Sequence, residues 1–288
     1  MEFPLIQLAQ KDFPPLLTEI TDAPKQLMVR GTLPSYDMKW LAVVGSRKYT
    51  PYGKSVCERL IGDLRGAPVV IVSGLALGID SLAHRAALAS GLTTVSVPGS
   101  GLGWDVLYPS SNRALAKEIL KSGGALLSEF EEGFKATQFS FPQRNRIMAG
   151  MSHATLLIEA EERSGTLITA RLATEYNREL LVVPGSIFSA NTAGTHQFLK
   201  LGARAVTSAA DILDALGLQS KTDTATDADM PKDLTEHEAK IFAILAAPHS
   251  RDDLSGKLPF NATELAIALS TLEIKGIICE ELGYLRRT

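Results

Sequence analysis

The stretch Val69-Val-Ile-Val-Ser-Gly-Leu-Ala-Leu-Gly-Ile-Asp80 decides the fold of this chain. Its four β-branched residues predict a short buried strand, and Gly74 and Gly78 then mark a loop. We expect Asp80 to cap a helix that continues through Ser90. A strand, a glycine-bearing loop and a helix therefore form one unit of the predicted fold.

The same unit recurs along the chain. Further short apolar strands are predicted at residues 41–44, 93–97, 125–127, 155–158, 180–183 and near 205, and helical patterns separate most of them. Continuous apolar strands that alternate with amphipathic helices are typical of a parallel sheet covered on both faces. The sequence therefore predicts an α/β fold with a doubly wound, mostly parallel sheet over residues 41–217.

Three further segments flank this domain. Residues 1–40 are punctuated by proline and are expected to wrap onto it, and residues 218–233 are rich in Thr and Asp, as in a flexible linker. Residues 234–288 show three helical patterns, at 236–246, 251–257 and 261–275, followed by a small hairpin. Three helices and a hairpin predict a winged-helix domain.

The composition is that of a soluble globular protein of 288 residues, 45% of them hydrophobic. No apolar run is long enough to span a bilayer and the N-terminus has no signal pattern, so we expect a cytoplasmic protein without membrane contact. Its two cysteines suggest neither a disulfide framework nor a zinc site.

The net charge of −3 is unevenly distributed. Residues 1–217 carry 21 Lys and Arg against 20 Asp and Glu, whereas residues 218–288 carry 8 against 12. Any nucleic-acid site must therefore come from a local concentration of positive charge.

The segment Phe139–Gly150 offers such a concentration, because Arg144, Asn145 and Arg146 follow a Phe-Ser-Phe-Pro lead-in. Pro142 suits the first position of a helix, which would leave the amides of residues 143–146 free to face an anion. Arginine forks suit phosphate oxygens, and Phe139 or Phe141 could stack on a base. Core phenylalanines and surface ion pairs are the alternative for this segment taken alone.

Other loops are expected to meet this segment at the carboxyl edge of the sheet, where such folds bind ligands. The candidate DNA-binding residues are Gly45, Ser46, Arg47, Ser73, Gly74, Gly78, Phe141, Gln143, Arg144, Asn145, Arg146, Ser164, Gly165 and Thr166. Glycines, hydroxyls and arginines without a base, nucleophile or metal set indicate an anion cradle. We therefore expect no enzyme activity, no metal and no cofactor.

Several catalytic or nucleotide motifs are incomplete. The triplet Gly53-Lys-Ser lacks the first glycine of a P-loop, and Gly99-Ser-Gly-Leu-Gly103 has Trp104 at the last glycine of a dinucleotide fingerprint. The acidic cluster at Glu159–Glu162 and the pair Asp80 and His84 are more simply interpreted as helix caps and helix-face neighbours than as catalytic groups.

Taken together, the motifs resemble those of the DNA-processing protein A (DprA/Smf) family. They are Val44-Gly-Ser-Arg47, Ser73–Asp80 with Ala83-His84, Tyr108-Pro109, Ser140–Gly150, Glu159 with Ser164-Gly-Thr166, and Val183-Pro-Gly185. The resemblance covers residues 1–217 and implies an extended Rossmann fold.

The resemblance further implies a homodimer that binds single-stranded DNA in natural transformation and recombination, protects it and helps to load the RecA recombinase, without catalysis. By position, it assigns DNA binding to Arg47, to the loop with Ser73, Gly74 and Gly78, and to residues 144–146. Two departures from the family pattern are Gln143, where a basic residue would strengthen the cradle, and the segment Thr195–Lys200.

Two other functions remain as alternatives. The first is a nucleotide-processing hydrolase on a related fold, but Thr169 stands where its Gly-Gly-x-Gly-Thr-x-x-Glu loop would supply the catalytic Glu. The second is an adaptor that binds no DNA.

The predicted recognition helix of the C-terminal domain contains Glu264, Glu273 and Lys275 as its only charged residues. A helix with this charge suits the major groove poorly. We expect the C-terminal domain to bind protein and not DNA.

Overall fold

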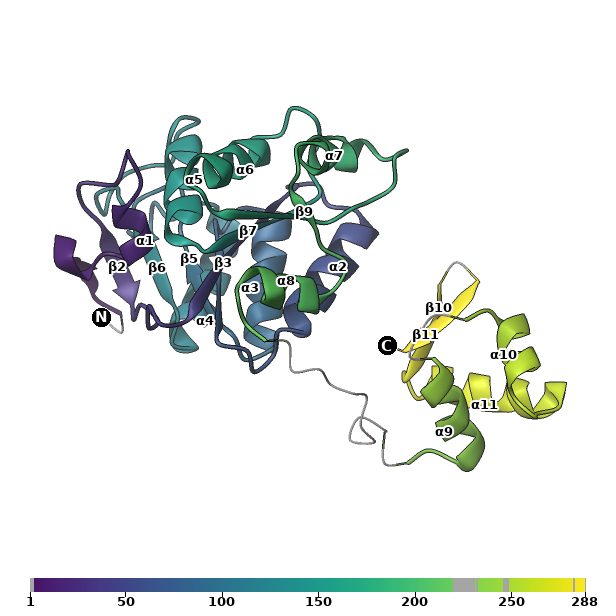
Figure 1. The fold of residues 1–288 in the computed structure, drawn as a ribbon. Coiled ribbons are helices and arrows are strands. Elements are labelled where there is room, and N and C mark those ends of the chain that lie inside the picture. The colour runs from purple at the N-terminus through teal and green to yellow at the C-terminus, as the bar shows by residue number, and fades with distance from the viewer. Residues whose placement is uncertain (1–2, 220–230, 232, 246–248, 282, 288) are drawn as a thin grey trace. The chain divides into compact units, whose positions relative to one another are not determined.

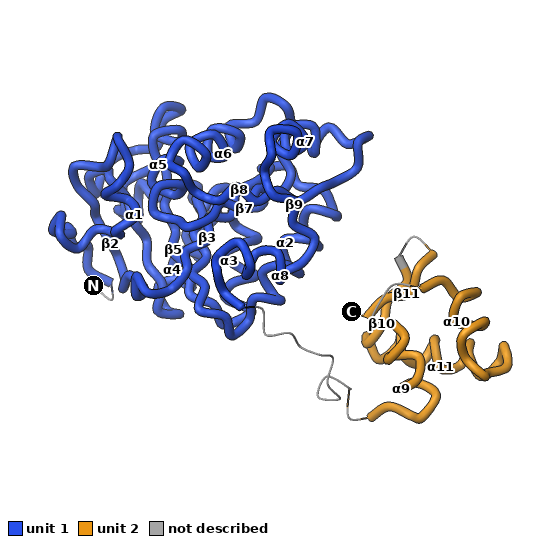
Figure 2. Tube along the Cα trace, viewed as in Figure 1, with its two compact units in different colours: residues 1–220 blue, residues 221–288 orange. Residues whose placement is uncertain are grey.

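The protein, seen in a computed structural model, divides into two compact units, residues 1–220 and residues 221–288 (Figure 2). The structure describes residues 3–219, 231, 233–245, 249–281 and 283–287. Most of the predicted linker, 218–233, lies outside the described residues. Each unit is therefore considered by itself.

Among the described residues, a nine-stranded sheet organises the first unit (Figure 1). Its spatial order is β1-β2-β6-β5-β4-β3-β7-β8-β9. The strands are β1 (Leu5–Gln7), β2 (Met28–Gly31), β3 (Lys39–Gly45), β4 (Val69–Ser73), β5 (Thr93–Ser96), β6 (Ala125–Ser128), β7 (Ala154–Ile158), β8 (Glu179–Val182) and β9 (Arg204–Ala205). The strands from β6 across to β9 all pair in parallel, which confirms the predicted doubly wound sheet.

Helices cover both faces of this sheet because both sides of its central strands are apolar. Val44 of β3 packs into one buried cluster, whereas Val43 packs into another on the opposite face. On the first face lie α1 (Pro15–Thr18), α5 (Ser140–Met151), α6 (Thr166–Glu175) and α7 (Ala193–Lys200) (Figure 1). On the second lie α2 (Pro51–Gly62), α3 (Ile79–Ala89), α4 (Arg113–Lys121) and α8 (Ala209–Ala215).

The direction of winding reverses at β3. The chain runs from β3 through β4 and β5 to β6 on one side, then returns to β7 on the other side of β3. In open α/β sheets such a switch point leaves a crevice at the carboxyl ends of the two central strands. A ligand site is therefore expected beyond Gly45 and Ile158, the last residues of β3 and β7.

Residues 1–40 do more than wrap onto the sheet. They supply β1 and β2, and β2 pairs antiparallel with β6. The short helix α1 packs its buried Leu17 beneath α5, since Leu17 lies close to Gly150. The sequence does not predict these two strands, because three or four residues are too few to show an apolar period.

The second unit contains three helices and an antiparallel hairpin in its described part, as predicted. They are α9 (Glu236–Ile244), α10 (Arg251–Lys257), α11 (Ala262–Ile274), β10 (Ile278–Glu281) and β11 (Tyr284–Arg287). Each helix begins with a capping box, in which the N-cap side chain and an acidic side chain satisfy each other's amides. No helix in the described part of either unit is long and apolar enough to cross a membrane.

Candidate nucleic-acid interface

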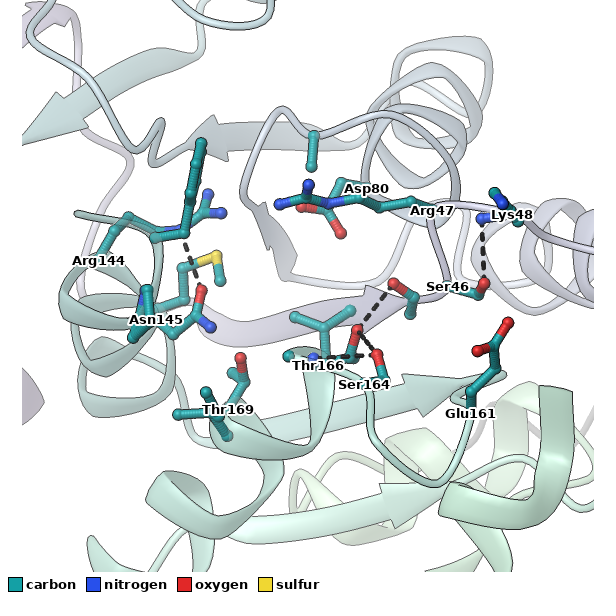
Figure 3. A pocket seen from close by; sticks show the side chains of 18 of the residues that line it. Ser46, Arg47, Lys48, Asp80, Arg144, Asn145, Glu161, Ser164, Thr166 and Thr169 are labelled. Carbon is teal, nitrogen blue, oxygen red and sulfur yellow. Dashed lines mark hydrogen bonds between the residues drawn. The ribbon is translucent and has the colours of Figure 1, made fainter. Parts of the chain in front are cut away.

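A cavity of about 580 Å³ opens at the switch point (Figure 3). Its walls come from the loop after β3, the first turns of α5, and the segment between β7 and α6, with Asp80 of α3 as a further contribution. The lining residues that carry polar side chains are Ser46, Arg47, Lys48, Asp80, Gln138, Arg144, Asn145, Glu161, Ser164, Thr166 and Thr169. This lining carries three cationic side chains and two carboxylates, so its formal net charge is positive.

The loop after β3 is held tightly against β7 and α6. A Cβ atom on Gly45 would lie 2.0 Å from the carbonyl oxygen of Ile158, so only glycine allows this approach. The Thr166 hydroxyl donates to the Gly45 carbonyl at 3.0 Å, and the Lys48 amide donates to Ser46 Oγ at 3.0 Å. These bonds turn the backbone so that residues 46–48 form one wall of the cavity.

The glycine loop after β4 supports the cavity from behind. The buried Ser73 hydroxyl donates to the Val43 carbonyl at 2.7 Å, and Gly78 has a positive φ of 89° with no room for a Cβ beside Ser46. Ser73, Gly74 and Gly78 therefore do not line the cavity, although all three were candidate DNA contacts. Gly74 lies in a smaller hollow beside it.

Asp80 does not cap α3, contrary to the prediction, because Gly78 occupies the N-cap position. Its carboxylate turns back instead and accepts the Gly74 amide at 3.1 Å. Burial raises the pKa of Asp80, while the charge of Arg144 and backbone amides of the glycine loop act in the opposite direction. Asp80 thus holds the glycine loop by a hydrogen bond and interacts electrostatically with Arg144 and Arg47.

Arg144 is a buried arginine, with only 4% of its surface exposed. Its guanidinium donates to the carbonyls of Gly74, at 2.6 Å, and Val97, and its Nε donates to Asn145 Oδ1 at 3.1 Å. Burial lowers the pKa of Arg144 to about 10, and the charge of Asp80 opposes that shift. Arg144 therefore fixes the ends of β4 and β5 and adds positive potential to the cavity from its inner wall.

Arg47 is the exposed arginine of the cavity. Its guanidinium lies 5.2 Å from the centre of the Phe141 ring, which in turn lies 5.6 Å from the Tyr108 ring. Within the part of the chain that the structure describes, no carboxylate forms a salt bridge with Arg47. A cation above an aromatic pair at the mouth of a cavity can bind a phosphate and leave a ring face for a base.

Helix α5 begins at Ser140, and not at Pro142 as predicted. Pro142 is therefore the third residue of the helix, and the Gln143 amide already donates to the Phe139 carbonyl at 3.4 Å. The predicted cradle of free amides over residues 143–146 is wrong for this reason. The Ser140 hydroxyl, which donates to the Gly99 carbonyl at 2.6 Å, anchors the earlier start.

Arg146 and Gln143 lie outside the cavity lining. The Arg146 guanidinium donates to the Glu129 carboxylate and to the Asp22 carbonyl. Gln143 also interacts with Glu129, whose pKa is raised by burial and lowered in part by both of these neighbours. Residues two positions apart on a helix point in different directions, so Arg144 and Arg146 cannot both face the cavity.

The segment Ser164-Gly-Thr166 forms the third wall, at the start of α6. Ser164 Oγ accepts the Thr166 amide at 3.2 Å and donates to its hydroxyl at 3.0 Å. The nearby Glu159 carboxylate is absent from the cavity lining and accepts the Thr50 amide at 2.8 Å, at the start of α2. Glu159 therefore helps to cap α2, which agrees with the interpretation of the acidic cluster as helix caps.

The sequence patterns did not mark Lys48, Gln138, Glu161 and Thr169 as lining residues, nor Asp80 as a side chain that faces the site. Lys48 could have been found, because it follows Arg47 directly. Glu161 and Thr169 were considered only for catalysis, and Gln138 belongs to no motif, so only the fold brings these side chains to one cavity. In the described ranges, no three His, Cys, Asp or Glu side chains are grouped so that they could hold a metal ion.

His84 lies behind the site on α3, fully buried, and its Nδ1 lies 2.7 Å from the Thr94 hydroxyl. Burial lowers the pKa of His84 to about 3 from an ordinary value of 6.5. Between the folded-state pKa of about 3 and the ordinary pKa of 6.5, His84 is protonated in the unfolded chain but not in the folded chain. The free energy of unfolding therefore falls as the pH falls through this range. We expect His84 to remove about 2 kcal/mol of stability between pH 6.5 and 5.

Urea unfolding at both pH values checks this expectation, with His84→Gln as the comparison. The variant is expected to be less stable at neutral pH but to lose about 2 kcal/mol less than the wild type on acidification. Equal losses in the two proteins would contradict the expectation.

Comparison with known proteins places the chain in a family. Residues 4–217 match the family model described as "DNA recombination-mediator protein A". The chain belongs to this DprA/Smf family. It is 41% identical over 212 residues to the DNA processing protein DprA of Streptococcus pneumoniae, an alignment that covers 74% of each protein. Protein Smf of Synechocystis is 32% identical and aligns with 96% of this chain and 78% of its own length.

Two solved DprA structures share the fold. That of the Streptococcus pneumoniae protein is 39% identical, with a TM-score of 0.66 over 74% of each chain. That of the Helicobacter pylori protein is 31% identical, with a TM-score of 0.66 over 74% of this chain and 96% of its own. The latter structure was described for its "unique single-stranded DNA binding mode".

Proposed function

We propose that this chain binds single-stranded DNA in the cytoplasm without reading its base sequence, and that the cavity at the switch point is the binding site. The observation that carries the proposal is Arg47, an exposed guanidinium at the cavity mouth with no salt-bridge partner among the described residues. The binding mode described for the related Helicobacter pylori protein supports the same substrate.

The chemistry of the walls suits a phosphate backbone. Arg47 and Lys48 are exposed cations, and the hydroxyls of Ser46, Ser164 and Thr166 lie across the cavity from Arg144 and Asn145 (Figure 3). Contacts to phosphate fix the position of a strand and carry no base information. Binding through them releases counterions and weakens as salt rises.

The rings of Phe141 and Tyr108 supply the preference for single strands. Phe141 lines the cavity, and Tyr108 lies beside it with nearly half of its surface exposed. Every base has a flat face that can stack on a ring, but those faces are hidden in a duplex. A single strand therefore gains a contact that duplex DNA does not offer.

We also propose that the site performs no catalysis. The hydrolase alternative requires a glutamate at position 169, where the cavity has the buried Thr169. Of the two carboxylates in the lining, Asp80 accepts the Gly74 amide, and Glu161 is exposed on the segment between β7 and α6. A general base must lie within hydrogen-bond reach of the proton that it removes, with a free oxygen to accept it.

The second unit is proposed to bind protein and not DNA. Its cations in and around α11 are already neutralised: Lys275 lies 2.9 Å from the Glu238 carboxylate, and Arg251 pairs with Glu280 at 2.8 Å and Glu273 at 3.4 Å. Few charges remain to contact phosphates. Homodimerisation, protection of incoming DNA and the loading of RecA in natural transformation rest on the family resemblance.

Fluorescence anisotropy tests the proposed function. We expect the full chain and residues 1–220 to bind a labelled single strand with equal affinity, and a blunt duplex of the same sequence far more weakly. Affinity should fall steeply with salt and stay constant when the base order is permuted. Equal binding of the duplex would contradict the proposed preference, and a loss of affinity without residues 221–288 would contradict the role proposed for the second unit.

A further inference from the structure

We infer that the single strand continues from the cavity onto a second stacking platform, formed by Ile187 and Phe188 in the loop 184–191 and by Tyr49 and Tyr52. We call these four side chains the loop platform. The inference rests on the proposed function, because it extends the path of the same DNA strand beyond Phe141.

The loop platform is unusually exposed for its chemistry. Phe188 is 93% exposed and Ile187 is 80% exposed, and Tyr49 and Tyr52 each expose close to half of their surface. Single exposed apolar residues are ordinary, but four on two hydrogen-bonded segments beside a polar cavity indicate a surface that binds a ligand. Aromatic side chains of this kind are the ones on which nucleic-acid bases stack.

Two hydrogen bonds join the loop to the chain segment that follows β3. Asn191 Nδ2 donates to the Lys48 carbonyl at 3.0 Å, and the Tyr52 hydroxyl donates to the Pro184 carbonyl at 2.6 Å. Lys48 itself lines the cavity. Both ends of the loop are therefore fastened to the chain segment that follows β3, and a strand that leaves the cavity past Lys48 meets the platform next.

The tip of the loop has a defined shape. Ser186 Oγ accepts the Phe188 amide at 3.2 Å, and the Ser186 carbonyl accepts the Ser189 amide at 3.1 Å and the Thr192 hydroxyl at 2.5 Å. These bonds form a tight turn that presents Ile187 and Phe188 outward. Because the backbone of the turn is already fixed, it loses little conformational freedom when a base stacks on a ring that it carries.

The charge of the two segments that carry the loop platform favours a polyanion over a basic or uncharged protein surface. Neither residues 38–57 nor residues 180–210 contain an Asp or Glu, whereas both segments contain Lys and Arg. These segments themselves do not repel a phosphate backbone. A carboxylate from elsewhere, that of Glu159, lies near Tyr52 and accepts the Thr50 amide. The single strand that we place in the cavity is therefore the occupant that fits best.

Binding to two oligonucleotides of equal length, one of thymidines and one abasic, tests the inference in the full chain. We expect Phe188→Ala to bind the thymidine strand about tenfold more weakly than the wild type and the abasic strand equally well. Ile6→Ala is the matched control, because Ile6 is an exposed apolar residue on β1, the other edge of the sheet. It should leave both affinities unchanged.

Other results would overturn the inference. Wild-type affinity of Phe188→Ala for the thymidine strand, or an equal loss on both strands, would mean that Phe188 stacks on no base. A lower mass of Phe188→Ala by light scattering would assign the loop platform to an interface between copies of the chain. Failure of the wild type to bind either strand would refute the proposed function itself, which is a distinguishable outcome.

Discussion

An Arg144→Met protein is expected to lose about 3–5 kcal/mol of stability, because the change leaves a buried carboxyl group without its cation. Arg144 is 4% exposed, and it holds the carbonyls of Gly74 and Val97 while its charge faces Asp80. Urea unfolding followed by tryptophan fluorescence measures this loss. Both tryptophans, Trp40 and Trp104, lie in the first unit, so the signal reports on that unit alone.

The double variant Arg144→Met with Asp80→Asn provides the control. Removing the charge of Asp80 as well should restore part of the lost stability, since the two side chains interact and their effects should not add. A loss below about 1 kcal/mol in Arg144→Met would show that the interactions of Arg144 with Asp80 and the two carbonyls contribute less to stability than their burial suggests.

The second large effect is expected from Arg47→Ala, which should weaken binding of single-stranded DNA by about 1–3 kcal/mol. It should also lower the slope of log affinity against log salt by about one, because one phosphate contact is lost. Anisotropy titrations at several salt concentrations measure both quantities. The stability of the protein should change by less than about 0.5 kcal/mol, since the side chain is exposed.

Arg85→Ala is the matched control for this variant. Arg85 is an exposed arginine on α3 that is not part of the cavity lining, so its loss changes the net charge equally without removing the proposed contact. Equal effects of the two variants would mean that general charge, and not the position of Arg47, determines the affinity.

The parallel sheet and its helices could be predicted from the sequence because their signal is local. The run Val69–Val72 is apolar on both sides of the strand, and the helix after Asp80 repeats its apolar residues with a helical period. The position of the site followed from the same pattern, since the loops after parallel strands meet at one edge. The strands β1 and β2 were too short to carry such a signal.

The role of each polar residue depended on tertiary structure. The sequence marked Arg47, Arg144 and Arg146 alike as phosphate contacts, but the fold leaves Arg47 exposed, buries Arg144 against Gly74 and pairs Arg146 with Glu129. Gly74, a partner of Arg144, lies 70 residues away along the chain, and Glu129 and Asp22, the partners of Arg146, lie 17 and 124 residues away. Local periodicity determined the elements of this protein, whereas packing between distant segments decided which cations remain free to bind a ligand, because only packing sets burial and side-chain direction.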